Sequence, residues 1–178
     1  MKGIVFTEFL EMVESKFNYN LVDEILNETD LPSGGIYTAI GTYDHSEIIK
    51  LVSKLSEKTN IPVEDLVYSF GVHLFDVFSK GYTQFFAKAT NAFEFLYSIE
   101  NYIHTEVKKL YPDAELPSFQ ITKTTDTHLV MIYSSERKMA KLAHGLIDGC
   151  LNYYGEKAEV SLNALNSDGS KVQFDIKK

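Results

Sequence analysis

The sequence predicts an α+β fold. Its helical N-terminal lobe covers about residues 1–84, and its mixed C-terminal lobe, about residues 85–178, carries a four-stranded antiparallel sheet in the order β-β-α-β-β. Up to about residue 110, apolar residues recur every three or four positions, as in helices that bury one face. Beyond Pro117 the pattern alternates instead, as in strands. The 178 residues suffice for one core, and no repeat or Pro/Ser-rich linker marks a second domain, so we expect a single domain.

The first three helices are predicted by apolar stripes and their boundaries. Residues 5–17 space their apolar side chains by three and four, so that these share one face. A shorter stripe over residues 21–26 stops at residues 31–35, where a proline and two glycines favour a turn. The segment Asp-His-Ser-Glu at 44–47 has capping-box spacing ahead of a third stripe over residues 48–55.

Two further helices complete the helical region. Pro62 suits a first-turn position ahead of an unusually broad apolar face over residues 66–78. Asn91 with Glu94 has the spacing of another cap and opens a helix that ends before Pro112. We expect that last helix to run without interruption.

Two hairpins are predicted in the C-terminal lobe. Strands at 119–123 and 128–134 form the first, and strands at 160–164 and 172–176 form the second. Residues 137–154 return to helical spacing between them.

Composition excludes several classes of function. The 17 basic and 25 acidic residues give a net charge of -8, which opposes binding to nucleic acid because that affinity comes largely from Lys and Arg. No segment is apolar over the ~20 residues that a membrane span needs, and no signal-peptide core is present. The single cysteine, Cys150, excludes an internal disulfide and any all-cysteine metal site. We therefore expect a cytoplasmic protein.

His104 is the first candidate for chemistry. It lies at the margin of the apolar stripe of its helix, where its ring could face a cavity. A neutral imidazole is a good axial ligand for haem iron. On spacing alone, however, a partly buried structural histidine is the favoured interpretation, since only Glu100 and Lys108 lie one turn away.

The second candidate is the segment Tyr133-Ser134-Ser135-Glu136-Arg137. A strand period of two predicts that Tyr133 and Ser135 share one side, together with Arg137 where the strand extends that far, and there their donors could bind a carboxylate. The alternative is an arginine at the strand end with hydroxyls that pair across the sheet. In isolation the pattern favours that alternative.

Taken together, these features resemble the H-NOX family, the haem nitric oxide/oxygen binding domains. The resemblance rests on the opening Met-Lys-Gly, on His104 in an aromatic-rich helix, on Pro117 and on the Tyr-x-Ser-x-Arg motif at 133–137, and it covers essentially the whole chain. It implies haem b, iron protoporphyrin IX, between the two lobes, with His104 as proximal iron ligand. It also implies that Tyr133, Ser135 and Arg137 hold the propionates and that Pro117 distorts the porphyrin.

The resemblance also bears on the choice of gas. Oxygen-binding members carry a distal tyrosine at the position that Leu142 takes here. The other positions that match the distal pocket are Val5, Phe9, Leu74, Phe78 and Leu146. Because none of these side chains donates a hydrogen bond, we expect nitric oxide, and also carbon monoxide, to bind in preference to oxygen.

The sequence thus predicts a non-enzymatic sensor of nitric oxide at ferrous haem. Release of His104 and relaxation of the haem would signal to a separate partner, by resemblance a histidine kinase or a cyclic-di-nucleotide enzyme. The alternatives are an oxygen-binding haem protein, a haem enzyme with His73 as its speculative acid-base group, and a haem-free module that binds an apolar carboxylate. His73 more often has a surface role, and Cys150 is more often a small buried hydrophobe.

Overall fold

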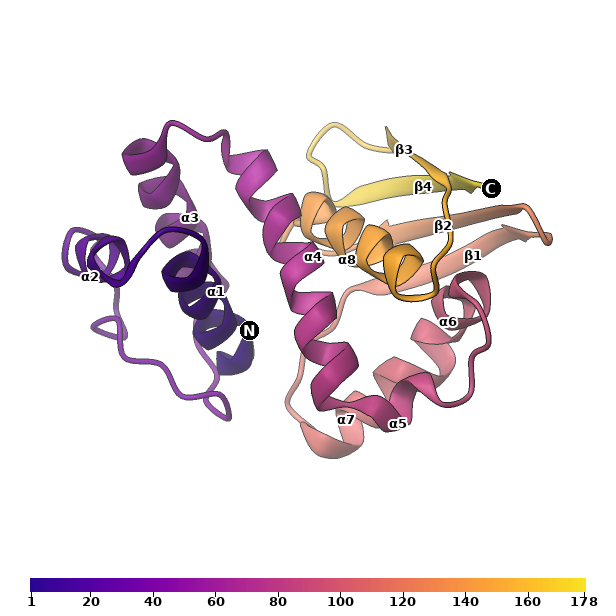
Figure 1. Ribbon diagram of the computed structural model, residues 1–178, viewed down its shortest axis with the longest axis horizontal. Coiled ribbons are helices and arrows are strands. Elements are labelled where there is room, and N and C mark those ends of the chain that lie inside the picture. The colour runs from indigo at the N-terminus through magenta and orange to yellow at the C-terminus, as the bar shows by residue number, and fades with distance from the viewer.

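The computed structural model describes residues 1–178 (Figure 1). The N-terminal part contains α1 (Gly3–Lys16), α2 (Tyr19–Asn27), α3 (His45–Thr59) and α4 (Val63–Gly81). Helices α1, α2 and α3 gather on one side of the long helix α4, and the sheet lies on its other side. None of the helices combines the length and the apolar character that a membrane crossing requires.

Local side-chain chemistry explains where these helices begin. The side chain of Asn18 accepts a hydrogen bond from the Leu21 amide at the start of α2, and Asp44 accepts one from the Ser46 amide at the start of α3. The predicted capping box at 44–47 is only half formed. Glu47 is buried and accepts hydrogen bonds from Ser33 and Tyr37, so its carboxylate ties the 31–37 loop to α3.

Between α4 and the sheet the chain departs from the prediction. The segment contains α5 (Thr83–Phe86), α6 (Ala92–Ser98), a π-helical turn η1 (Ile99–Ile103) and α7 (His104–Leu110). The short helix α5 was not predicted. The expected single helix to residue 110 is interrupted, because the His104 amide donates to the carbonyl of Ile99, five residues back, instead of to residue 100. Apolar spacing alone does not reveal one inserted residue in a helix.

The predicted sheet is confirmed. Its strands are β1 (Ser118–Thr124), β2 (His128–Ser134), β3 (Glu159–Ala164) and β4 (Lys171–Lys177), antiparallel in the order β1-β2-β4-β3. Helix α8 (Ala140–Tyr153) lies between the two hairpins in sequence and packs against one face of the sheet (Figure 1). Alternate residues of β4, Val172, Phe174 and Ile176, are buried, as the period of two requires.

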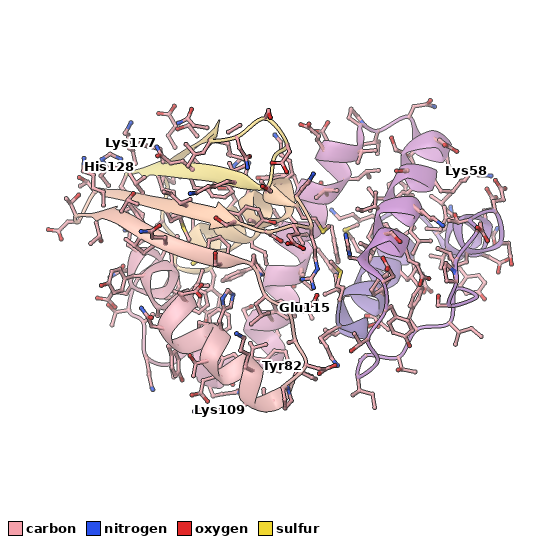
Figure 2. The ribbon with its side chains drawn as sticks, turned by 180° about the vertical axis from the view of Figure 1, so that it is seen from behind. Lys58, Tyr82, Lys109, Glu115, His128 and Lys177 are labelled. Carbon is pink, nitrogen blue, oxygen red and sulfur yellow. The ribbon has the colours of Figure 1, made fainter.

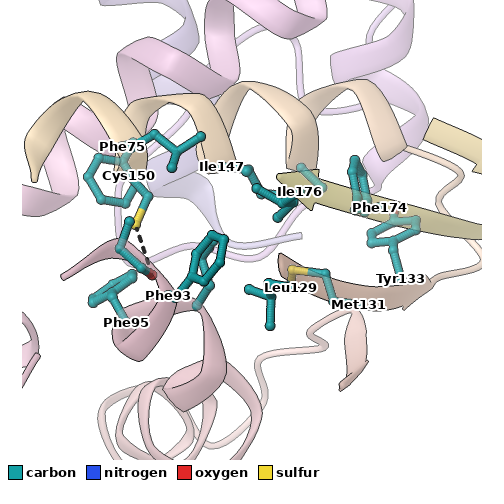
Figure 3. Packing of buried hydrophobic residues seen from close by; sticks show 14 of the residues in the cluster. Phe75, Phe93, Phe95, Leu129, Met131, Tyr133, Ile147, Cys150, Phe174 and Ile176 are labelled. Atoms are coloured by element: carbon teal, nitrogen blue, oxygen red, sulfur yellow. Dashed lines mark hydrogen bonds between the residues drawn. The ribbon is translucent and has the colours of Figure 1, made fainter. Parts of the chain in front are cut away.

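Two hydrophobic cores form, and α4 belongs to both. One core lies between the sheet, α6 and α8, and Figure 3 shows Phe75 of α4 reaching it alongside Cys150 and Ile147. The other lies within α1–α4 and includes Leu74, the neighbour of Phe75 in the chain. Helix α4 therefore packs apolar side chains into each core.

Helices α4 and α8 cross in unusually close contact. A Cβ atom built on Gly71 would lie 2.3 Å from the carbonyl oxygen of Leu142, and one on Gly145 would lie 2.1 Å from that of Tyr68. The two glycine Cα atoms face each other at the crossing, so only glycine permits this backbone-to-backbone approach.

Candidate functional site

A cavity of about 300 Å³ lies where the two cores meet. Its walls come from α1, α4–α8, the π-turn η1, the 111–117 segment, β1 and the end of β2. Of its 31 lining residues, 25 are hydrophobic. A slot of this kind suits a flat apolar ligand that carries a few polar groups.

Ten of the eleven predicted site residues line this cavity. They are Val5, Leu74, Phe78, His104, Pro117, Tyr133, Ser135, Arg137, Leu142 and Leu146. Phe9 is the exception: its ring is fully buried in the helical core, edge-on to Phe70 at a centroid distance of 5.3 Å. Helix α1 thus presents Val5 to the cavity and turns Phe9 away, a distinction that the shared apolar face of residues 5–17 does not make.

His104 stands in the cavity wall with one ring nitrogen engaged. Its Nδ1 lies 3.3 Å from the Glu100 Oε2 atom, and its side chain is 14 % exposed. Burial lowers the pKa of His104, and the Glu100 carboxylate only partly offsets this decrease. The imidazole is therefore neutral near pH 7. With Nδ1 directed at a carboxylate, Nε2 is the nitrogen that remains for a metal.

The π-turn lies in the cavity wall immediately before His104. Ile99, Ile103 and Val107 line the cavity, and so does His104. Single π-turns inside helices occur frequently at functional sites.

The Tyr-x-Ser-x-Arg motif is arranged differently from the prediction. Only Tyr133 belongs to β2, which ends at Ser134, so the three residues do not share a strand face. A turn follows, in which the Lys138 amide donates to the Ser135 carbonyl and Lys138 has a positive φ of 56°. This turn, rather than strand alternation, brings Ser135 and Arg137 to the cavity beside Tyr133.

The hydroxyls of this motif keep their protons available. The Tyr133 hydroxyl oxygen accepts from the Met139 amide at 3.1 Å, and the Ser135 hydroxyl oxygen accepts from the Arg137 amide at 3.2 Å. A hydroxyl that accepts a bond in this way can still donate its own proton. Both groups therefore remain able to donate to a carboxylate.

Arg137 is engaged by a residue that the sequence did not single out. Its guanidinium donates to the Glu115 side chain and to the Glu115 carbonyl, both at 2.7 Å. Glu115, labelled in Figure 2, lines the same end of the cavity, and its side chain is 84 % exposed. The Arg137 guanidinium thus already binds a carboxylate, and that carboxylate is largely exposed to solvent.

Further positive charge gathers at this end. Lys2 and Met1 line the cavity, and the Met1 ammonium donates to the Tyr43 carbonyl at 2.7 Å. Burial and the nearby Arg137 lower the pKa of this ammonium. Lys2 pairs with Asp113 at 3.2 Å, which links α1 to the segment between His104 and Pro117. These cations could have been inferred only from the tertiary approach of α1 to that segment.

A tyrosine pair in the cavity wall was also missed. The hydroxyls of Tyr82, labelled in Figure 2, and Tyr111 lie 3.3 Å apart, and burial raises the pKa of Tyr82 to about 12. The contact of Glu100 with His104, by contrast, could be predicted, because Glu100 precedes His104 by one helical turn, the spacing at which side chains meet.

His73 and Cys150 lie outside the cavity wall. His73 Nε2 is 3.7 Å from a Glu8 carboxylate oxygen, a contact between α4 and α1. Cys150 is buried, and its thiol approaches the Ala92 carbonyl at 3.8 Å (Figure 3). Burial raises the pKa of this thiol, which keeps it protonated and unreactive.

The cavity meets the three demands of a haem. It supplies an apolar slot, a neutral imidazole with a free Nε2, and hydroxyl and guanidinium donors together at one end for carboxylates. No cluster of three or more His, Cys, Asp or Glu side chains suits a bare metal ion. A lone imidazole over an apolar slot fits iron in a macrocycle, which brings its own four ligands.

Fold and cavity together define a haem-binding sensor domain. The model of the Haem-NO-binding family matches residues 2–162 of the chain. The chain therefore belongs to the H-NOX family of haem-based gas sensors, and its cofactor is haem.

Solved structures of H-NOX proteins share this fold. The Fe(II) unliganded H-NOX protein from K. algicida is 43% identical, with a TM-score of 0.96 and coverage of 100% of this chain and 96% of that one. For the H-NOX protein from S. oneidensis in the Fe(II)NO state the values are 26%, 0.91, 99% and 98%. For the IWP-051-bound H-NOX from Shewanella woodyi in the Fe(II)CO state they are 40%, 0.85, 100% and 94%. No curated protein matches the sequence.

Proposed function

We propose that this chain senses nitric oxide and passes the signal to a separate protein, with His104 as the proximal ligand of ferrous haem. The observation that carries the proposal is the placement of His104. It is the one imidazole in the cavity wall, its Nδ1 is held by a carboxylate, and its Nε2 is free. When bound, haem would supply a ferrous iron, which binds nitric oxide and would then hold His104 less strongly.

The proposal assigns separate roles to the residues around the slot. Tyr133, Ser135 and Arg137 would anchor the propionates. A propionate would replace the Glu115 carboxylate as the partner of Arg137. Pro117, whose ring is rigid, lines the cavity in the segment that joins α7 to β1 and would press on the macrocycle. Release of His104 from the iron would free α7 and relieve this pressure. The helical lobe would then shift against the sheet.

The lining of the slot favours nitric oxide over oxygen. Val5, Leu74, Phe78, Leu142 and Leu146 contribute only hydrocarbon to the cavity. Bound oxygen carries partial negative charge and needs a donor, whereas nitric oxide binds ferrous iron without one. The Fe(II)NO state of the S. oneidensis protein and the Fe(II)CO state of the S. woodyi protein support this choice of gases.

The proposal makes the chain a non-enzymatic sensor of the cytoplasm. His73, the acid-base group considered for a haem enzyme, lies outside the cavity wall, and His104 is assigned to the iron. Its output is therefore read by a partner such as a histidine kinase or a cyclic-di-nucleotide enzyme, which must bind the two states of the sensor with different affinity. A tenfold bias requires about 1.4 kcal/mol of coupling.

The test compares wild type with His104→Gly, to which imidazole is supplied. The unliganded ferrous variant should lose haem without imidazole and keep it with imidazole. After nitric oxide is added, the two proteins should give the same absorption spectrum, because neither then has a protein nitrogen on the iron. Thr105→Gly is the matched control: Thr and His have similar helix propensity, so each change to glycine costs roughly a few tenths of a kcal/mol, and Thr105→Gly leaves the imidazole in place.

Two results would contradict the proposal. Wild-type-like ligation in His104→Gly without imidazole excludes His104 as the ligand. A wild-type spectrum that remains six-coordinate under nitric oxide excludes its release. An absence of any haem absorption in freshly purified and haem-reconstituted protein would favour the haem-free carboxylate binder instead.

A further inference from the structure

One carboxylate oxygen joins the His104 ring to the sheet. The Oε2 atom of Glu100 lies 3.3 Å from His104 Nδ1 and accepts a hydrogen bond from the Phe119 amide at 2.9 Å. Glu100 belongs to the π-turn just before His104, and Phe119 belongs to β1, two residues beyond Pro117. The three groups come from the two chain segments that flank the cavity on this side.

We propose that Glu100 is the positioning residue of His104. Its carboxylate accepts a hydrogen bond from Nδ1–H, which fixes the tautomer that presents Nε2 and fixes the rotation of the ring. The same oxygen ties that ring to the start of β1. The inference rests on the proposed function, in which His104 binds the iron, and adds a residue that sets how strongly it does so.

The position of β1 in the sheet explains why Glu100 stays in place. β1 is an edge strand, and its only neighbour is β2. The Phe119 amide points away from that neighbour, so it needs a partner from elsewhere in the chain. Glu100 supplies this partner, which holds a carboxylate that is otherwise 44 % exposed and free to rotate into water.

The other charged residues near His104 do not offer this contact. Glu106, two residues beyond it, pairs with Lys109 at 2.6 Å. Lys108 follows His104 by one turn, but its side chain is a cation and cannot accept a hydrogen bond from Nδ1–H. Glu100 is therefore the carboxylate within reach of the ring, and Glu106 is a natural control.

A negative acceptor on Nδ1 makes the imidazole a stronger donor to iron through Nε2. The bond between iron and His104 should therefore weaken when Glu100 is removed. The dissociation rate of haem should rise at least about tenfold, which is the usual size of the effect of losing such a partner. The tether to Phe119 has a second consequence. A movement of the ring pulls on the residue that follows the Pro117 segment, so departure of His104 reaches β1 directly.

The experiment compares Glu100→Ala, Glu100→Gln and the control Glu106→Gln in the haem-loaded protein. Resonance Raman spectra of the unliganded ferrous form report the iron–histidine stretching frequency. We expect this frequency to fall in Glu100→Ala and to stay at the wild-type value in Glu106→Gln. In Glu100→Gln, whose amide oxygen is a neutral acceptor, it should lie between the values of wild type and Glu100→Ala. Glu100→Gln preserves size and remains informative if the alanine variant fails to fold.

Hydrogen exchange of the Phe119 amide gives a readout that does not involve the iron. It should accelerate in Glu100→Ala relative to wild type and to Glu106→Gln. An unchanged iron–histidine frequency in both Glu100 variants overturns the positioning role while leaving His104 as the ligand. If wild type shows no iron–histidine band at all, the proposed function fails and this inference fails with it.

Discussion

Substitution of Gly145 by alanine should separate α4 and α8, the two helices that supply Leu74, Phe78, Leu142 and Leu146 to the cavity wall. The added Cβ would lie 2.1 Å from the Tyr68 carbonyl oxygen, whereas ordinary contact begins at 3.4 Å. The backbone of α8 must therefore move about 1.3 Å away from α4, the difference between these two distances. A backbone carbonyl in a helix has no rotamer to escape into.

The cost follows from two opposing effects. Overpacking of this kind costs about 1–3 kcal/mol, while alanine in place of glycine recovers up to about 1 kcal/mol of helix propensity. Because the added atom meets a backbone carbonyl, we take the upper end of the overpacking cost, about 3 kcal/mol less about 1 kcal/mol, and expect Gly145→Ala to lower the free energy of unfolding by about 2 kcal/mol. For a chain of this size that corresponds to a fall in Tm of about 4–8 °C.

The assay is thermal unfolding of the haem-loaded protein followed by far-ultraviolet circular dichroism. Gly81→Ala is the matched control, because it lies in the same pair of helices and its added Cβ meets no atom within 4 Å. That variant should unfold at or slightly above the wild-type temperature. If Gly145→Ala also unfolds at the wild-type temperature, the helix crossing yields without cost and the reasoning is wrong.

Three further predictions concern the site and the contact between the lobes. Arg137→Ala should speed the transfer of haem to an acceptor globin more than Ser135→Ala, by about 1 kcal/mol of lost binding, because it removes a charged bidentate donor; equal rates would argue against propionate anchoring. Leu142→Tyr should give a persistent oxygen complex of the ferrous protein in air, seen by absorption, and an unchanged spectrum would mean that its hydroxyl misses the bound gas. Hydrogen bonds from Thr42 and from Lys2 lower the pKa of Asp113. The stability that Asp113 adds is therefore complete above its unfolded pKa near 3.9 and disappears as the pH falls through the lower pKa of the folded state. Asp113→Asn should therefore lower the urea midpoint at neutral pH and leave it unchanged in strong acid, and an equal loss at both pH values would refute this.

The sheet and most helices were predictable because their signals are periodic and local. Strand alternation predicted both hairpins to within one residue at each end, and the predicted caps Asp44 and Asn91 are caps in the structure. Asn18 is a further cap that was not predicted. The π-turn was not predictable, since an insertion of one residue leaves Ile99, Ile103 and Val107 on the cavity side and keeps the apolar spacing intact.

The site was predictable as a set of residue types but not as a geometry. His104 and Arg137 both reach the cavity, as the family resemblance implies, and their roles remain proposals. The capture of Arg137 by Glu115 depends on a turn after β2 and on a loop 22 residues earlier, which no local pattern connects. Phe9 packs against Phe70 and does not line the cavity, because one face of α1 contributes to both the core and the cavity.

The position of α4 between two cores limits how the halves of the molecule can move. Leu74 and Phe75 are consecutive residues, yet their side chains are buried in different cores. A translation of one half away from the other would pull one of these side chains out of its core. A rotation about the axis of α4 keeps both buried, and on the α8 side the glycine crossing holds that axis close to the sheet. Helix α4 is therefore the natural pivot, and a change that begins at the cavity would reach the outer surface of α1, α2 and α3 as a turn about it.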